Sequence, residues 1–401
     1  MRILHLATSL SGGAGIAARR ICEAQRDAGL DSRILGGGIS SGSKLKSNEE
    51  ILEISKKSAL LSSLNTVIQS TLIQKDDRLV TSISIDQPAL KEINFADFNV
   101  VHLHAFYNLI NYKSIIKFSK NVPLVITMHD QRFFTGGCHY SFDCTKYEAS
   151  CEKCPQTRKA LGFIPRKTLS KNFKLLSDAK NITFISPSIW LMNRAKTSKL
   201  VSSFNHRQIY NPIPGVYTQI ESRNKPGETL NIGFISQNLN NPYKGFMVLL
   251  EAIRKVESKR QIHLRVFGSG KFEQKFLNTE VTQINFDNDS SATNAYNSCD
   301  LIIVPSEQDN LPSVVSESLM CGVPVIGSNV GGIGEILKIF NLPTFEPGDI
   351  SSLAKLIQDF DYPLSSKELS QKARSLFSYE ASAATHIETY KEAIRNHTDL
   401  V

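Results

Sequence analysis

The chain has 401 residues, of which 41% are hydrophobic and 21% charged, as is usual for an ordinary soluble globular protein. Its length is sufficient for two domains, each with its own core. No run of about 18 apolar residues occurs, which argues against a membrane-spanning helix, and the N-terminal segment lacks the apolar region and cleavage site of a signal peptide. We therefore expect a cytoplasmic protein.

The net charge of +8 is unevenly distributed. Residues 1–200 contain 28 Lys and Arg against 16 Asp and Glu, whereas the remaining residues contain 18 against 22. A basic half joined to a mildly acidic half predicts that the first half contacts something anionic, the alternative being a solvated basic surface. Nucleic acid is not expected as a partner, because no motif of that class appears.

In chain order, the first half alternates apolar runs with helical patterns. Residues 2–8 (RILHLAT) predict a strand, and a glycine-rich stretch leads from it into a helical pattern over residues 15–29. Further strands are predicted at 32–38, 100–105, 124–130 and 182–188. Strands that alternate with helices predict a parallel sheet covered on both faces. The segment 41–78 carries no readable pattern beyond a weak helical tendency.

The pattern restarts after a proline-containing connection at 208–217. Strands are predicted at 230–236, 263–270, 301–305 and 323–328, with a helix at 246–256. A last helical stretch, 381–397, has no strand after it and is expected to pack back on the first domain. The prediction is an α/β protein with Rossmann-like domains at 1–213 and 226–378, facing each other across a cleft, and a crossover helix at 379–401.

In the stretch 306–322 (SEQDNLPSVVSESLMCG), two of the three carboxylates, Asp309 and Glu317, stand eight positions apart around a proline. Asp309 precedes the predicted helix, Pro312 stands where that helix would begin, and Glu317 falls one turn inside it. Backbone N–H groups at a helix start suit a phosphate, and a carboxylate can accept two hydrogen bonds from a vicinal diol such as a ribose. From spacing alone, a capping acid and a solvated glutamate are the favoured explanation of the stretch.

The wider context favours the first interpretation. The sequence PSEQDNLPSVVSESLMCGVPVIGSNVGGIGEIL resembles the nucleotide-sugar site of retaining, family-4 GT-B glycosyltransferases, whose signature is an acid, seven residues and a glutamate, followed by a small-residue turn, a strand and a Gly-Gly loop. The resemblance continues through the first glycine loop, the His-Asp pair after LVITM, the PYKGF segment and the FGSG turn. Each motif alone is weak, but the set is specific.

The resemblance implies a role for each matching residue. Glu317 would hold the ribose hydroxyls, Asp309 the hydroxyls of the transferred sugar, and Lys244 the donor diphosphate. His129 would contact the donor sugar near the reacting centre, and Asp130 would fix the tautomer of His129 or orient the acceptor. Further donor-binding positions implied in this way are Asn310, Leu311, Pro312, Ser313, Gly12, Gly13, Asn238 and Gly268.

The sequence departs from the family pattern at the diphosphate. Two positions that commonly carry arginine are Asn238 and Tyr243 here. One guanidinium fewer should weaken the stabilisation of the departing charge. Either Arg19 or Arg132 substitutes for it, or catalysis is slower. The first acid of the signature is also shorter than usual, since aspartate replaces glutamate.

The first glycine loop (SLSGGAGIAAR, 9–19) matches a weak dinucleotide fingerprint, Gly13-x-Gly15-x-x-Ala18. An NAD site would need an acid at the end of the second strand. That strand ends in glycines at 36–38 without an acid, so a dehydrogenase is disfavoured.

Four of the seven cysteines fall within seventeen residues of a loop predicted at 136–156, namely Cys138, Cys144, Cys151 and Cys154. Their spacing, which ends in a C-x-x-C-P knuckle, favours a structural tetrahedral zinc site. Free thiols or an iron–sulfur centre are the next interpretations, and two disulfides come last because the cytosol is reducing. Two Asp-x-Asp tripeptides, at 287–289 and 359–361, are not read as metal sites, because the fold pattern differs from that of the metal-dependent class.

Residues 156–180 carry seven Lys and Arg and one acid, with Leu, Phe and Ile interspersed. This composition suits either an interfacial helix on anionic lipid or a solvated basic helix over the core. The family context supports the first alternative, with the protein held peripherally on the inner face of the plasma membrane.

The resemblance implies a retaining transferase without a catalytic metal. It would move a sugar from a UDP- or GDP-sugar to a hydroxyl of a glycan linked to polyprenyl diphosphate, in bacterial surface polysaccharide synthesis. The alternatives are a nucleotide-sugar epimerase of the same fold, a non-catalytic nucleotide-sugar-binding scaffold, and a zinc-dependent interaction module.

Overall fold

The computed structural model divides the chain into two compact units, Met1–Asn211 with Ser382–Val401, and Pro212–Ala381. The residues that the structure describes are 1–37, 49–51, 67, 86–107, 109–179, 181–219, 228–257, 260–270, 279–284, 288–361 and 365–399. Most of the segment 41–78, with its weak helical tendency, lies outside these residues. The predicted first domain ends at residue 213 and the predicted connection spans 208–217. In this division, residues 212 and 213 belong to the second unit.

The first unit is built on a parallel sheet whose described strands follow the order β3-β2-β1-β4-β5-β6-β7. The strands are β1 (Arg2–Ala7), β2 (Asp31–Gly36), β3 (Glu49–Ile51), β4 (Val100–His104), β5 (Leu124–Thr127), β6 (Ile182–Ser186) and β7 (Asn205–Gln208). The interiors of β1, β4, β5 and β6 are buried, which explains why these strands read as largely continuous apolar runs. The order reverses between β1 and β4, and open α/β sheets bind ligands beyond the carboxyl ends of their strands at such a point.

Helices cover both faces of this sheet. The helices of the unit are α1 (Gly12–Asp27), α3 (Tyr112–Ser119), α4 (Phe163–Leu176), α5 (Ile189–Thr197) and most of α12 (Tyr379–Thr398), with short 3-10 turns at Pro88–Glu92, Phe95–Asp97, Gln131–Phe134 (η3), Lys146–Glu148 and Lys159–Leu161. Residues alternate between the faces: Leu4 and Leu6 pack on the side of α3, α4 and α5, whereas Ile3 packs on the side of α12.

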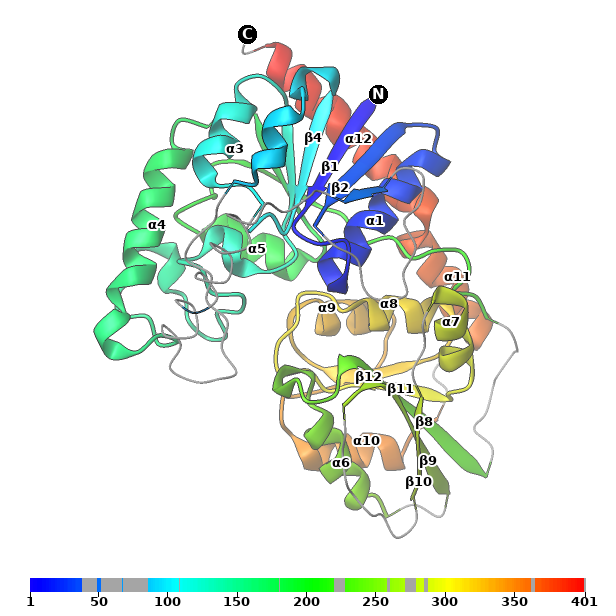
Figure 1. Cartoon of the computed structure of the whole chain (residues 1–401). Coiled ribbons are helices and arrows are strands. Elements are labelled where there is room, and N and C mark those ends of the chain that lie inside the picture. The colour runs from blue at the N-terminus through cyan, green and yellow to red at the C-terminus, as the bar shows by residue number, and fades with distance from the viewer. Residues whose placement is uncertain are drawn as a thin grey trace. The chain divides into compact units, whose positions relative to one another are not determined.

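The C-terminal helix α12, drawn in red in Figure 1, belongs from Ser382 onward to the first unit, as the sequence predicts. Tyr390 and Ala393 join a core that contains Val100 of β4 and Val125 of β5. The Tyr390 hydroxyl also forms hydrogen bonds with Gln25 of α1 and His102 of β4, both 2.7 Å long. The helix is therefore attached to the sheet by apolar burial and by buried polar contacts.

The second unit repeats the same topology. Its described strands follow the order β10-β9-β8-β11-β12-β13 and are all parallel. They are β8 (Thr229–Asn238), β9 (Gln261–Ser269), β10 (Thr279–Ile284), β11 (Leu301–Val304), β12 (Val325–Ser328) and β13 (Thr344–Phe345). The reversal of order falls between β8 and β11. Both units are thus Rossmann-like, which confirms the predicted fold class.

Two layers of helices enclose the second sheet. They are α6 (Phe246–Arg254), α7 (Asp289–Asn297), α8 (Ser313–Met320), α9 (Gly331–Ile339), α10 (Ile350–Gln358) and α11 (Ser366–Phe377), with a 3-10 turn, η6, at Pro242–Lys244. Figure 1 shows α6 and α10 on one side of the sheet and α7, α8 and α9 on the other. Among the described helices none is both long and apolar enough to cross a bilayer.

Candidate active site

An ion pair between Lys244 and Asp309 lies beyond the carboxyl ends of β8 and β11. Lys244 ends η6, which follows β8, and its Nζ atom is 2.5 Å from Oδ2 of Asp309. The carboxylate side chain is 10% exposed and the lysine side chain 32% exposed. The structure therefore brings together two residues that the sequence places 65 positions apart, at the switch point of the second sheet.

Two glycines allow backbone segments to pack closely around the ion pair of Lys244 and Asp309. Gly245 has a φ of +69°, and a Cβ atom on it would overlap the carbonyl oxygen of Pro305, directly after β11. Gly331 has a φ of +53°, and a Cβ atom on it would overlap the carbonyl oxygen of Asp309. The amide of the next residue, Gly332, donates to the carbonyl of Asn310 at 2.5 Å. Both segments that flank the ion pair are thus packed backbone against backbone.

Glu317 lies in α8 and is 8% exposed. The hydroxyl of Tyr296, from α7, donates a hydrogen bond to its Oε2 atom at 2.6 Å. Burial, and then the charge of Glu317, raise the pKa of Tyr296 well above its ordinary value, so the phenol stays protonated and remains a donor. Tyr296 therefore orients the carboxylate that the family resemblance predicts to bind the ribose.

The other positions predicted to line the donor surround this helix start. Asn310 and Leu311 are buried, Pro312 is the N-cap of α8 and Ser313 its first residue. The N–H groups of a first helical turn have no acceptor within the helix.

The structure explains Gly268 and Asn238 by packing and turn formation. A Cβ atom on Gly268 would overlap the carbonyl oxygen of Ser236 in the neighbouring strand. Asn238 is exposed at the end of β8, where its Oδ1 atom accepts from the amide of Asn240 at 2.9 Å. Asn238 brings no charge to the diphosphate position.

The glycine loop of the first unit leads from β1 into α1, which begins at Gly12 with a φ of +70°. A Cβ atom on Gly12 or Gly13 would meet nothing within 4 Å in the part of the chain that the structure describes. Gly15 differs, because a Cβ atom there would collide with the backbone of Ser9. The loop is therefore closely packed at its third glycine and open beside the first two.

His129 and Asp130 follow β5 and are half-buried. The Nε2 atom of His129 forms a hydrogen bond of 3.2 Å with Nδ1 of His104. Asp130 accepts from the backbone amide of Arg132 at 2.9 Å and from its guanidinium, with one contact of 2.6 Å. Burial alone would raise the pKa of Asp130, but the Arg132 and His139 side chains hold it below its ordinary value. Asp130 is thus paired with Arg132, and the ring of His104 contacts His129.

The two arginines considered as substitutes at the diphosphate both have carboxylate partners in their own unit. Arg132 pairs with Asp130, and Arg19 pairs with Glu49 through contacts of 2.5 and 3.0 Å. To bind a phosphate, either guanidinium would have to interact with the phosphate and its carboxylate partner at the same time.

The four clustered cysteines line one cavity of about 10 Å³, together with Tyr147 and Gln156. All four are free thiols in the structure. Burial, assisted by the neighbouring thiols, raises the pKa of Cys138 above its ordinary value and that of Cys151 to about 12. The surrounding loop is held by hydrogen bonds such as that from Gln156 Nε2 to the carbonyl of Tyr140, at 2.6 Å. A volume of this size admits a single water-sized species.

The described part of the basic segment, residues 156–179, contains helix α4 and the turns on either side of it. One face of the helix, with Pro165, Leu169 and Leu176, is buried. Phe163 and Phe173 are 46% and 41% exposed, with Lys167 and Lys199 over their rings. The expected contact with a membrane stays a prediction.

Comparison with known proteins identifies the second unit. Residues 218–375 match the model of the family described as glycosyl transferases group 1. The chain therefore carries a group 1 glycosyltransferase domain. Over 322 residues it is 24% identical to the putative colanic acid biosynthesis glycosyl transferase WcaC of Escherichia coli K12, covering 73% of this chain and 76% of that relative.

Solved structures show that the fold of this glycosyltransferase is GT-B. Sucrose-phosphate synthase of Thermosynechococcus elongatus matches with a TM-score of 0.64 at 15% identity, covering 98% of this chain and all of that chain. Anabaena Alr3699/HepE in complex with UDP-glucose matches with a TM-score of 0.58 at 16% identity, with the same coverage. At these identities the likeness establishes the fold alone.

Sequence reasoning missed three residues that contact or extend from the predicted site residues of the two units. Tyr296 orients Glu317 from another helix, and no local sequence pattern predicts a contact between the two residues. His104 contacts His129, and His5 in turn contacts His104 at 2.9 Å. The signal was present in the strand sequences RILHLA and VVHLHA, where histidines take alternate positions on one face of apolar strands.

We predict that Gly331→Ala lowers the free energy of unfolding by about 2–4 kcal/mol, because a strained positive φ is added to an overlap with the backbone of Asp309. Gly348→Ala is the matched control, since Gly348 also has a positive φ, +78°, but a Cβ atom there meets nothing within 4 Å. It should cost about 1–2 kcal/mol. Urea unfolding of both variants measures the difference, and equal losses would contradict close packing at Asp309.

Proposed function

We propose that this glycosyltransferase moves a sugar, with retention of anomeric configuration, from a UDP- or GDP-sugar to a hydroxyl of a lipid-linked glycan. The observation that carries the proposal is the ion pair of Lys244 and Asp309 at the switch point of the second sheet, beside the buried carboxylate of Glu317. A cation, an acid for sugar hydroxyls and an acid for a ribose are the groups that a nucleotide-sugar requires.

Each residue takes one part of the donor in this proposal. The Lys244 ammonium binds the diphosphate and stabilises the charge that develops on it as the sugar leaves. Glu317 accepts hydrogen bonds from the ribose hydroxyls, and a carboxylate has enough lone pairs to keep its bond with Tyr296 as well. Asp309 accepts from hydroxyls of the transferred sugar. His129 contacts that sugar from the first unit.

The proposed transfer breaks the bond between the anomeric carbon and the leaving phosphate oxygen. A bond to the acceptor oxygen forms on the same face of the sugar, and the acceptor proton passes to the leaving phosphate. The step needs no catalytic metal, because Lys244 and the helix-terminal N–H groups of α8 take up the developing charge.

The relatives support the choice of donor and acceptor. A structural neighbour was solved with UDP-glucose, and the curated relative WcaC is named for colanic acid biosynthesis. We infer a nucleotide-sugar donor and a bacterial surface polysaccharide acceptor. The basic helix α4 with its exposed phenylalanines suits a polyprenyl-diphosphate carrier at the cytoplasmic face of a membrane.

The proposal predicts that purified protein consumes a UDP- or GDP-sugar, and that two variants lose this turnover. Lys244→Ala should lower kcat roughly 100-fold or more, because it removes charge stabilisation at the leaving group. Glu317→Gln should raise the KM for the donor roughly tenfold, because a neutral amide holds the ribose less well. Donor hydrolysis and transfer to a lipid-linked glycan extract are measured in parallel.

The matched controls are Glu251→Gln, at a half-buried position of α6, and Lys255→Ala, at the exposed position directly after that helix. They should retain full turnover. Undiminished turnover in both Lys244→Ala and Glu317→Gln would contradict the proposed donor site. Release of an isomerised sugar without an acceptor would indicate an epimerase, and nucleotide binding without any turnover would indicate a scaffold, which the neutral Asn238 makes the second candidate.

We also propose that the cysteine loop binds one structural zinc ion through Cys138, Cys144, Cys151 and Cys154. Its support is the single ion-sized cavity that all four side chains line and the preference of zinc for four thiolates in closed structural sites. Among the described residues, the group of three ligand atoms within 4.8 Å of one another is formed by histidines, and no three of the cysteine sulfur atoms are this close. Binding of the ion would therefore draw the sulfur atoms closer together. The site would stabilise the loop and take no part in transfer.

Elemental analysis of the purified protein should find about one zinc ion per chain. Cys144→Ser should lose the zinc and lower the melting temperature, because an open ligand set no longer closes the loop. Cys299→Ser is the control, since Cys299 lies in the other unit and donates to the carbonyl of Ala295, as a serine can. Absence of zinc, with a chelator leaving the melting temperature unchanged, would show that the thiols act without a metal.

A further inference from the structure

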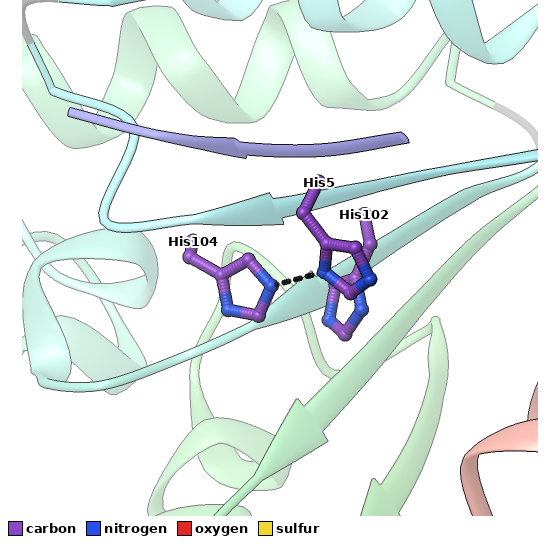
Figure 2. A group of neighbouring side chains, drawn as sticks. All are labelled: His5, His102 and His104. Atoms are coloured by element: carbon purple, nitrogen blue, oxygen red, sulfur yellow. Dashed lines mark hydrogen bonds between the residues drawn. The ribbon is translucent and has the colours of Figure 1, made fainter. Parts of the chain in front are cut away.

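Three histidines from adjacent strands are buried together in the first sheet. His5 of β1 and His102 and His104 of β4 are all 0% exposed. They lie on the sheet face that α1 and α12 cover, since His5 stands two positions after Ile3 and His102 two positions after Val100, and residues two apart on a strand share a face. Figure 2 shows the three rings next to one another, with a hydrogen bond between His5 and His104.

Hydrogen bonds extend this group into a line that ends at His129. Gln25 Oε1 is 2.9 Å from His5 Nε2, and His5 Nδ1 is 2.9 Å from His104 Nε2. His104 Nδ1 is then 3.2 Å from His129 Nε2. All four residues belong to the first unit. A continuous line of side chains therefore connects helix α1 with the residue predicted to contact the donor sugar.

His102 belongs to a side branch of the same network. Its Nδ1 atom bonds the hydroxyl of Tyr390, and its Nε2 atom bonds the hydroxyl of Thr127, both at 2.7 Å. Tyr390 is in turn bonded by Gln25 Nε2. Loss of His102 would disturb the same buried layer without breaking the line from Gln25 to His129.

The cluster has the composition of a metal site, because one ring nitrogen from each of the three histidines lies within 4.8 Å of the others. However, all six ring nitrogens of His5, His102 and His104 already have hydrogen-bond partners in the protein. A metal would have to displace several of these bonds in a fully buried layer. The hydrogen-bonded network therefore accounts for the cluster without an ion.

The rings of the line are neutral at ordinary pH. Burial lowers the pKa of His5 to about 3 and that of His129 to about 4, and it lowers the pKa of His104 well below its usual value. The charged groups near His129 are Asp130 and Arg132, which pair with each other. A neutral imidazole has one donor and one acceptor nitrogen, so each bond in the line fixes the tautomer of the next ring.

The amide of Gln25 sets the direction of the whole line. Its Nε2 atom donates to Tyr390, and its Oε1 atom accepts from Ser32 Oγ at 3.0 Å and from the Nε2 proton of His5. The Nδ1 atom of His5 must then accept from His104 Nε2, and the Nδ1 atom of His104 must accept from His129 Nε2. The opposite amide orientation would reverse every donor and acceptor.

We propose that Gln25, His5 and His104 are positioning residues that hold the proton of His129 on Nε2 and leave its Nδ1 atom as a hydrogen-bond acceptor. The chemical consequence is specificity for a donor. Nδ1 of His129 would accept a hydrogen bond from a hydroxyl of the bound sugar and could not donate one to a phosphate oxygen. This consequence rests on the proposed glycosyltransferase function, whereas the tautomer itself does not.

Nitrogen-15 NMR of the histidine side chains tests the tautomer in the protein without ligand, with His129→Gln used to assign the signals of His129. We expect an N–H signal at Nε2 of His129, a pyridine-type Nδ1, and a scalar coupling across the hydrogen bond from that N–H to Nδ1 of His104. A proton on Nδ1 of His129, or a coupling in the opposite direction, would overturn the proposal even if the protein is an active glycosyltransferase.

The functional arm compares three variants. His104→Leu should lower donor turnover roughly tenfold, the effect of losing one oriented hydrogen bond. His104→Gln should recover most of it, because an amide can accept from His129 and donate to His5. His102→Leu should reduce the melting temperature to a similar extent as His104→Leu but keep the turnover and the His129 signals. Equal loss of turnover in the two leucine variants would show core disruption and overturn the positioning role.

Discussion

Close backbone packing at the end of strand β11 is the constraint on which the candidate site depends. Gly245 lies against the carbonyl of Pro305, and Gly331 lies against that of Asp309, in positions that no side chain could share. These contacts set Lys244 beside Asp309 before any ligand arrives. A partly exposed ion pair contributes little to stability, so its value is geometric: an ammonium held in place loses little entropy when a diphosphate binds.

The repeated topology explains where the chemistry-bearing residues lie. Both sheets reverse their strand order once, between β1 and β4 and between β8 and β11. The glycine loop follows β1, Lys244 follows β8 and Asp309 follows β11, so each belongs to the carboxyl end of a strand at a reversal. The first sheet adds a buried polar layer, which a hydrophobic core tolerates because its histidine nitrogens are hydrogen-bonded.

Elements with strong local patterns could be predicted from the sequence, and contacts between distant segments could not. Strands such as β1 and β11 are short apolar runs between turn residues, and the structure confirms them. Strand β7 was missed because its sequence, NHRQ, is polar and only half-buried at the sheet edge. The motif around Asp309 and Glu317 was readable because a helix start brings local residues together. The histidine line needed the register of β1, β4 and β5, which no single segment contains.

The central claim is that Lys244 binds the diphosphate of a nucleotide donor, while Glu317 and Asp309 accept hydrogen bonds from its ribose and its sugar. Calorimetric titration with UDP and GDP, each compared with its monophosphate, tests it most directly in the wild type and in Lys244→Met. The account predicts that the diphosphate of one base binds more tightly than its monophosphate, and that the variant loses most of this difference. Equal affinity of wild type and variant for the diphosphate would contradict it.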